Sequence, residues 1–253
     1  MISRYEVMLN SIPMSNLDPK IQILDIRYPP VTAQDTTFTT AKRQGARVSR
    51  RYYAQRDVTI SFGVYEYDIR KRMEICAAVN RWAKNGGVLE TNDKPGQFLQ
   101  CVCTKYPSVE SAKDWTKALS VTFTAYEVPF WQEKNQATAT LTGTSGNGFL
   151  YVPGDVDGAF VEISANANAA LASVTFGVNG RTLTLSGLSV AQDQVINIAY
   201  DAKAIQSIKV GTTSLLDKRT GVDDLLAKAG MNTLTLTAGA FVSAVFKVRG
   251  WWM

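Results

Sequence analysis

The stretch Val174–Gly187, VTFGVNGRTLTLSG, decides the fold class of the second half of this chain. Apolar and small polar residues alternate on both sides of Asn179-Gly180, a dipeptide that favours the two-residue turn of a β-hairpin. Similar short alternating runs follow one another from Phe149 to Val248, with turn residues between them. Strands of this length and spacing are typical of a β-sandwich. Only Val222–Lys228 is expected to be helical in this half, as a short crossover.

The first half combines strands with one helix. Val58–Val64 and Leu119–Tyr126 alternate with a period of two, as half-buried strands do. Ile21–Tyr28 has the same pattern with a phase slip near Leu24, which indicates a β-bulge. The sequence therefore predicts a mainly β domain here as well.

The one convincing helix begins after Asp68, whose side chain can cap its first turn. Gly86-Gly87 then ends it, because glycine tolerates the left-handed conformation of a helix end. The expected apolar stripe has helical spacing and consists of Ile69, Met73, Cys76 and Asn80, widened by Ile75, Val79 and Trp82.

Charge and composition change near residue 135. Residues 1–134 contain 19 Lys and Arg against 14 Asp and Glu, whereas residues 135–253 contain 8 of each. From Asn135–Gly148 onward, Ala, Thr, Ser, Gly, Asn and Val dominate. We therefore predict two domains. Residues 1–134 form a β-sandwich or barrel-like domain with one α-helix, and residues 135–253 form a second β-sandwich.

The 253 residues include no histidine, which excludes Ser-His-Asp and Cys-His nucleophile systems and His-ligated zinc. The sequence has no GxxxxGK[ST] motif either. We expect no enzyme, no catalytic residue, no metal and no cofactor. Of the three cysteines, Cys101 and Cys103 are expected to be sheltered thiols. Asp155 and Asp157, in PGDVDG, are expected to form a turn rather than a calcium loop.

The segment Lys42–Arg56, KRQGARVSRRYYAQR, is basic throughout and has no acidic residue. Three interpretations stay open for it: a contact with a neighbouring subunit, a solvated loop, and a nucleic-acid patch. The first is preferred. The candidate contact residues are Arg43, Arg47, Arg50, Arg51 and Arg56.

Two aromatic residues of the second half are weak candidates for stacking on a sugar or a partner. They are Tyr151 and Trp251. For Trp251 the preferred alternative is packing at the end of the last strand.

The order of these segments resembles the distal tail proteins (Dit) of long-tailed, siphovirus-type bacteriophages. In the first half the resemblance depends on the strand VTISFGV, the helix DIRKRMEICAAVNRWAK, the turn Asn92-Asp93-Lys94-Pro95 and the exit Pro129-Phe130-Trp131. The second half resembles the galectin-like C-terminal sandwich of that family, through the hairpin VTFGVNGRTLTLSG and the closing strand FVSAVFKVRGWW. The resemblance covers about residues 4–252.

The resemblance implies a structural virion protein, a distal tail or baseplate hub. Six copies of such a protein form a ring that joins the tail tube to the tail-tip protein and often carries receptor-binding proteins. It further implies assembly in the host cytoplasm and DNA that only passes through the channel. We expect Arg47, Arg50 and Arg51 to face a neighbouring subunit or the tube, because phosphate contacts in an open channel would hinder passage of DNA.

The alternative is a carbohydrate-binding tail module that recognises a host cell-surface glycan. Galectins proper bind sugar with a histidine, arginines and a stacking tryptophan. The second half has no histidine and no tryptophan before Trp251, so a docking platform is the preferred interpretation.

Overall fold

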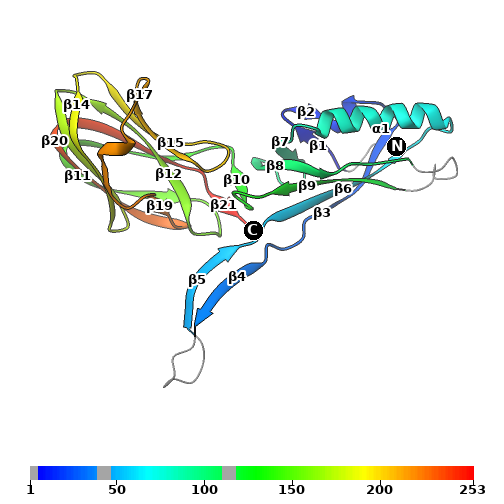
Figure 1. Cartoon of the computed structure of the whole chain (residues 1–253), viewed down its shortest axis with the longest axis horizontal. Coiled ribbons are helices and arrows are strands. Elements are labelled where there is room, and N and C mark those ends of the chain that lie inside the picture. Colours follow the sequence, from blue (N-terminus) through cyan, green and yellow to red (C-terminus); the bar gives the residue numbers. More distant parts are fainter. Residues whose placement is uncertain (1–4, 39–46, 110–117) are drawn as a thin grey trace. The chain divides into compact units, whose positions relative to one another are not determined.

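The computed structural model of the chain describes residues 5–38, 47–109 and 118–253, with only the backbone described at 36–38 and 47–52. The chain divides into two compact units, Met1–Trp131 (unit 1) and Gln132–Met253 (unit 2) (Figure 1). The boundary that we predicted from composition, after residue 134, lies just beyond strand β10 (Trp131–Glu133). Each unit is mainly β, and the one α-helix of the described chain lies in unit 1, so the predicted fold class is confirmed.

Unit 1 consists of antiparallel strands in the order β2-β1-β7-β8-β9-β6-β3. Their bounds are β1 (Val7–Leu9), β2 (Ile12–Pro13), β3 (Ile21–Arg27), β6 (Arg56–Val64), β7 (Gly87–Thr91), β8 (Gln97–Lys105) and β9 (Leu119–Ala125). The predicted alternation in β6 is confirmed, since Val58, Ile60, Phe62 and Val64 are all buried. The register of β3 against β6 shifts between Ile23 and Asp25, which is the bulge expected at Leu24.

Helix α1 (Ile69–Ala83) begins as predicted, because the carboxylate of Asp68 accepts a hydrogen bond of 2.8 Å from the backbone N–H of Arg70. At its other end, Gly86 has a φ of +60° and donates its N–H to the carbonyl of Ala83. The helix lies against the strands of unit 1 (Figure 1), where the ring of Trp82 meets the ring of Phe123 edge-to-face.

The predicted apolar face of α1 is confirmed at Ile75, Cys76 and Val79 and was wrong at Met73. The buried residues are Arg72, Ile75, Cys76, Val79 and Ala83, whereas the side chain of Met73 is 54% exposed. The buried stripe therefore follows the spacing 72-76-79-83. Arg72 is part of it, although the sequence pattern predicts that an arginine faces solvent. Long arginine side chains can cover apolar surface with their methylene groups.

Strands β4 (Ala33–Phe38) and β5 (Arg47–Tyr53) form a separate two-stranded antiparallel sheet in unit 1. Figure 1 shows this hairpin as an arm that leaves the other strands of the unit. The register pairs Ala33 with Tyr53 and Thr36 with Arg50, and it shifts once between Thr36 and Thr37.

Unit 2 is built around two long strands, β11 (Ala137–Val152) and β20 (Gly230–Val248), which pair with each other along nearly their whole length. The first half of β20 also pairs with β13, and its second half pairs with β12. The two halves thus belong to two sheets that share β11 and β20. Large apolar side chains of both sheets are buried, as in a sandwich; examples are Phe176 and Phe246, whose rings lie 6.1 Å apart.

The other strands of unit 2 extend these two sheets. Their bounds are β12 (Ala159–Ala167), β13 (Leu171–Val178), β14 (Arg181–Val190), β15 (Val195–Tyr200), β16 (Gln206–Val210), β17 (Thr213–Ser214), β18 (Arg219–Gly221), β19 (Leu226–Ala227) and β21 (Trp251–Trp252). The hairpin at Asn179-Gly180 is confirmed, since both residues have positive φ, 51° and 79°.

The helix expected over Val222–Lys228 is absent from the structure, which describes this segment as extended around β19. Leu225 and Ala227 are both buried, a spacing of two rather than of three or four. The carbonyl of Leu225 accepts a hydrogen bond from the N–H of Val161, so the segment packs beside β12. The apolar residues of this short run fit either period, and pairing with β12 selects the extended form.

The entry and the exit of unit 2 are neighbours. The N–H of Glu133 donates to the carbonyl of Gly250 over 3.0 Å, and the indole N–H of Trp252 donates to the Glu133 carboxylate over 2.7 Å. Within the described residues, no helix is long and apolar enough to span a bilayer.

Candidate interaction surfaces

Residues 47–53 of the basic segment form a strand rather than the loop that we considered. Arg47, Arg50 and Arg51 belong to β5, paired with β4, and only their backbone is described. Arg43 lies outside the described residues. Arg56 is separated from the others: it begins β6 and is 4% exposed. The structure therefore does not bring Arg56 to the surface.

The base of the hairpin is held to the body of unit 1 by backbone and ring contacts. The N–H of Ala54 donates to the carbonyl of Thr32 over 2.9 Å. The ring of Tyr53 meets the ring of Phe130 edge-to-face at a centroid distance of 4.9 Å. These contacts fix the point from which β4 and β5 leave the other strands.

The two segments that were most characteristic in the sequence meet at Tyr28. The Tyr28 hydroxyl donates to the Asp93 carboxylate over 2.7 Å, and its ring contacts Trp131 edge-to-face at 5.6 Å. The ammonium group of Lys94 lies 5.4 Å from the Tyr28 ring centroid and 5.5 Å from that of Trp131. Burial raises the pKa of the Tyr28 phenol, which therefore remains a hydrogen-bond donor.

The same turn is tied to the first strand. Two hydrogen bonds join Asn92 to the backbone of Glu6. The backbone N–H of Asn92 donates to the Glu6 carbonyl, and the Glu6 N–H donates to the side-chain amide oxygen of Asn92. The turn Asn92-Asp93-Lys94-Pro95 is therefore a structural junction between β1, β7 and the end of unit 1. We find a packing role for it.

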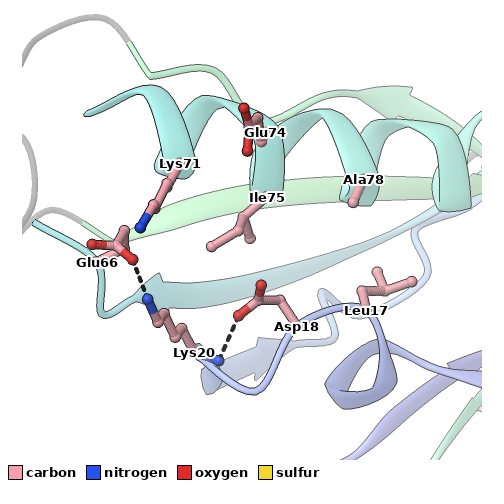
Figure 2. Close-up of a pocket in the computed structure, with 8 residues that line it drawn as sticks. All are labelled: Leu17, Asp18, Lys20, Glu66, Lys71, Glu74, Ile75 and Ala78. Atoms are coloured by element: carbon pink, nitrogen blue, oxygen red, sulfur yellow. Dashed lines mark hydrogen bonds and ion pairs between the residues drawn. The ribbon is translucent and has the colours of Figure 1, made fainter. Parts of the chain in front are cut away.

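A cavity of about 260 Å³ lies between α1 and the segment that precedes β3 (Figure 2). It is lined by charged residues of both signs and a few apolar ones, namely Leu17, Asp18, Lys20, Glu66, Lys71, Glu74, Ile75 and Ala78.

Most charges of this cavity are used within the chain. Lys20 forms an ion pair with Glu66, and its backbone N–H donates to Asp18 over 2.8 Å. Glu66 also accepts from the backbone N–H of Asp68. The hydrogen bond from the Lys20 side chain lowers the pKa of Glu66 the most, and the one from the Asp68 backbone is the second cause. Together they bring this pKa to about 2. The lining carries three acidic and two basic residues, and its Lys20–Glu66 ion pair joins the segment before β3 to the segment before α1.

The three thiols lie in unit 1, and burial raises the pKa of each. Cys101 is 3% exposed with a pKa of about 12, and Cys76 is also buried, whereas Cys103 is partly exposed. The expected burial of the two thiols is thus confirmed for Cys101, whereas Cys103 is only partly buried. Among the described residues, no three His, Cys, Asp or Glu side chains gather where a metal ion could be held.

Asp155 and Asp157 lie in the connection between β11 and β12, where a turn was expected, and each carboxylate bonds a segment distant in sequence. The Asp155 carboxylate accepts from the N–H of Met253, and the Asp157 carboxylate accepts from the N–H of Ala229, each over 2.9 Å.

The two candidate aromatics of unit 2 have opposite environments. Trp251 is 8% exposed and lies edge-to-face on Phe160, and its carbonyl accepts from the N–H groups of Asp155 and Val156. The preferred interpretation, packing at the end of the last strand, agrees with this position. Tyr151 is 64% exposed.

Sequence reasoning missed two residues beside Tyr151. Phe149 is 69% exposed on the same strand, and Met231 is 64% exposed on β20, directly opposite Tyr151 in the register. The signal was available in the run Phe149–Val152. Four consecutive apolar residues in an alternating strand must place two on the outer face.

The fold matches a solved phage protein along nearly the whole chain. The match is to the crystal structure of the Dit protein (gp 19.1) of phage SPP1, with a TM-score of 0.67 and 14% sequence identity, covering 97% of this chain and 98% of that chain. That protein is described as a paradigm of the hub adsorption apparatus in phages that infect Gram-positive bacteria. The resemblance seen in the sequence is therefore confirmed for the fold, which is Dit-type.

Two structures of the phage P2 baseplate in its activated conformation, with Ca and with Sr, match at TM-scores of 0.49 and 0.47. Their sequence identities are 11% and 10%, and the matches cover 99% and 98% of this chain and 98% of each matched chain. No protein-family model and no curated protein matches the sequence.

Proposed function

We propose that this protein is a structural hub of a bacteriophage tail tip, without catalysis. The observation that carries the proposal is the match to the SPP1 Dit protein over 97% of the chain, because a match of this extent includes both units. A single sandwich is shared by many unrelated proteins, but two different units in a fixed order are far more specific.

In this proposal, unit 1 is the belt domain of a ring of six copies, and unit 2 is a platform that projects from it. A closed ring needs two different faces on each subunit, so that one face meets the other face of the next copy. The ring joins the tail tube to the tail-tip protein and carries receptor-binding proteins, and it is assembled in the host cytoplasm.

The hairpin arm is the contact that we assign to the neighbouring subunit or the tube. It leaves the other strands of unit 1 (Figure 1), and its second strand carries Arg47, Arg50 and Arg51. Arginine forms bidentate pairs with carboxylates, which suits a contact between proteins. Arg43, between the two strands in sequence, is included in the proposal, whereas Arg56 is left out because it is buried.

The alternative of a carbohydrate-binding tail module has less support. Of its two candidate aromatics, only Tyr151 is exposed, and Trp251 belongs to the packing of unit 2.

The first test is the mass of the purified protein, measured by light scattering over a range of protein and salt concentrations. A ring predicts a species of about six times 27.7 kDa that dissociates as salt rises, because salt screens exposed ion pairs. The triple variant Arg47→Ser/Arg50→Ser/Arg51→Ser should dissociate at tenfold or more higher protein concentration than the parent.

The control removes the same charge from unit 2, at the exposed residues Lys203, Lys209 and Lys228, and should leave the mass unchanged. Purified tails should contain six copies of the chain at the end opposite the head, as counted by quantitative mass spectrometry and located by antibody labelling. A chain that is monomeric at every concentration and absent from tails would contradict the proposal.

A further inference from the structure

Three large apolar side chains form a small exposed cluster on unit 2, which we call the edge patch: Phe149, Tyr151 and Met231. Tyr151 and Met231 are directly paired across β11 and β20, and Phe149 lies two residues before Tyr151 on the same strand. Residues two apart on a strand share a face, so all three point outward together. Their exposed fractions are 69%, 64% and 64%, so no residue in the part of the chain that the structure describes covers them.

The sheet face around the edge patch carries no charged residue among its outward-facing positions on β11, β20, β13 and β14. These positions are Ser145, Asn147, Thr233, Thr235, Thr237, Ser173, Thr175, Gly177, Thr182, Thr184 and Ser186. The hydroxyls of Thr175 and Thr184 bond each other over 2.9 Å, which confirms that they share this face. Charged residues make up 19% of the chain, so an uncharged face of this extent is unusual for its surface.

The edge patch lies on an unprotected edge strand. In the described chain, β11 pairs only with β20, although it is 16 residues long. Residues 135–152 include neither a charged residue nor a proline, the two features that commonly protect sheet edges from pairing. In an antiparallel edge strand, every second residue directs its N–H and C=O away from its only neighbour, so these groups are available to another strand.

We propose that residues 145–152 of β11 bind an extended strand of another virion protein, which continues the sheet beyond β11 and covers the edge patch. The inference rests on the proposed hub function and specifies the binding mode and the chemistry of the partner. The partner strand presents uncharged side chains to Phe149 and Tyr151, because a charged group packed against these rings would lose solvation with no opposite charge on this face to pair with. Its larger apolar residues lie against Phe149 and Tyr151.

The composition of the patch favours a protein strand over a sugar. Aromatic residues and methionine are enriched at the cores of protein interfaces, where charged residues are depleted. Phenylalanine and methionine offer no polar group to a saccharide hydroxyl. A free backbone edge, in contrast, supplies the main-chain hydrogen bonds on which strand addition depends.

Hydrogen–deuterium exchange tests the proposal on the free chain and on purified tails that contain it. In the free chain, the amides of 145–152 that face away from β20 should exchange quickly. In tails, the same amides should slow by at least a hundredfold, whereas those of the exposed outer strand β17 should not change. A chain absent from tails would refute the hub itself. A chain present in tails with unchanged exchange at 145–152 would refute only the strand addition.

The variant Phe149→Lys/Tyr151→Lys places two charges on exposed positions of the patch and should fold normally. It should keep the mass of the parent in solution but lose the slowed exchange at 145–152 and lower the yield of infectious particles at least tenfold. The matched control Thr138→Lys/Thr140→Lys, at exposed positions of the other half of β11, should keep the yield within about twofold. Wild-type yield and exchange in the patch variant would overturn the proposal.

Two further results would also overturn it. Slowed exchange at 145–152 that appears in the free chain as its mass rises, and that the patch variant abolishes, would show that a second copy covers the edge. Slowed exchange in the free chain on addition of a neutral oligosaccharide such as maltoheptaose, without any change in tails, would show that the face binds sugar.

Discussion

The two units reach mainly β folds by different means. Unit 1 holds the α-helix, all three cysteines and most of the charge, and its junctions depend on individual side chains such as Tyr28 and Asn92. Unit 2 has no cysteine and depends on two long paired strands. Side-chain junctions fix particular points of unit 1, whereas unit 2 is held mainly by backbone pairing and leaves a sheet edge open. Unit 1 is therefore the part of the chain that can select a partner by charge, and unit 2 is the part that can select one by backbone pairing.

The largest expected effect comes from a core truncation that destabilises unit 2 and leaves unit 1 unchanged. Phe246 is fully buried against Phe176, so Phe246→Ala should lower the free energy of unfolding of unit 2 by about 3–5 kcal/mol. Circular dichroism during thermal unfolding measures the loss. Thiol labelling of Cys101, read by peptide mass spectrometry, reports unit 1 alone and should not change. Labelling that accelerates in step with the loss would show that the two units unfold as one.

The second change removes the main buried polar contact of unit 2. The side chain of Asn232 is fully buried; it donates to the carbonyls of Lys228 and Gly230 and accepts from the N–H of Lys228 and the amide of Asn179. Asn232→Ala leaves these groups without partners and should cost about 2–3 kcal/mol of unfolding free energy. Urea unfolding measures it, with the exposed Asn197→Ala as a control expected within about 0.5 kcal/mol.

The third change weakens unit 1 only. Asp68→Ala removes the cap of α1 and should cost about 1 kcal/mol, whereas Asp68→Asn should retain most of the stability. The readout is faster labelling of Cys101, whose burial and raised pKa of about 12 keep it unreactive in the folded state. An equal loss in both variants would mean that the cap does not hold this helix.

The smallest effect concerns the ion pair between Lys20 and Glu66. The pKa of Glu66 is lowered in the folded chain to about 2 from an ordinary value of 4.5. The pair therefore adds stability above about pH 4.5, and this stability is lost as pH falls toward 2. Melting temperatures measured across this range should decline less in Glu66→Gln than in the parent. Lys20→Gln should flatten the profile in the same way, and a parent-like slope in either variant would exclude the pair as its source.

Much of the fold is present in the sequence because alternation and turn chemistry are local. The hairpin at Asn179-Gly180, the alternating strand Val58–Val64 and the cap at Asp68 were all predicted correctly. Tertiary pairing decided the rest. Val222–Lys228 is extended because it pairs beside β12, and Arg47–Tyr53 is a strand because β4 pairs with it.

Candidate surface residues were harder to predict, because exposure depends on which face of an element meets the core. For this reason Met73, expected on the buried face of α1, is exposed, and Arg72 is buried. The outward side of Phe149 and Tyr151 became clear only once Leu150 and Val152 were placed inside. The roles of the arginines in β5 stay predictions.

The hydrogen bond between Glu133 and Gly250 has a consequence for how such a protein can change over generations. Because the bond joins residues near the two ends of unit 2, the unit is a closed module whose ends lie side by side. A recombination event that exchanges residues 132–253 would therefore replace the unit together with both of its ends. Unit 1 would keep its own core through the exchange, so a lineage could acquire a new second unit without altering the first.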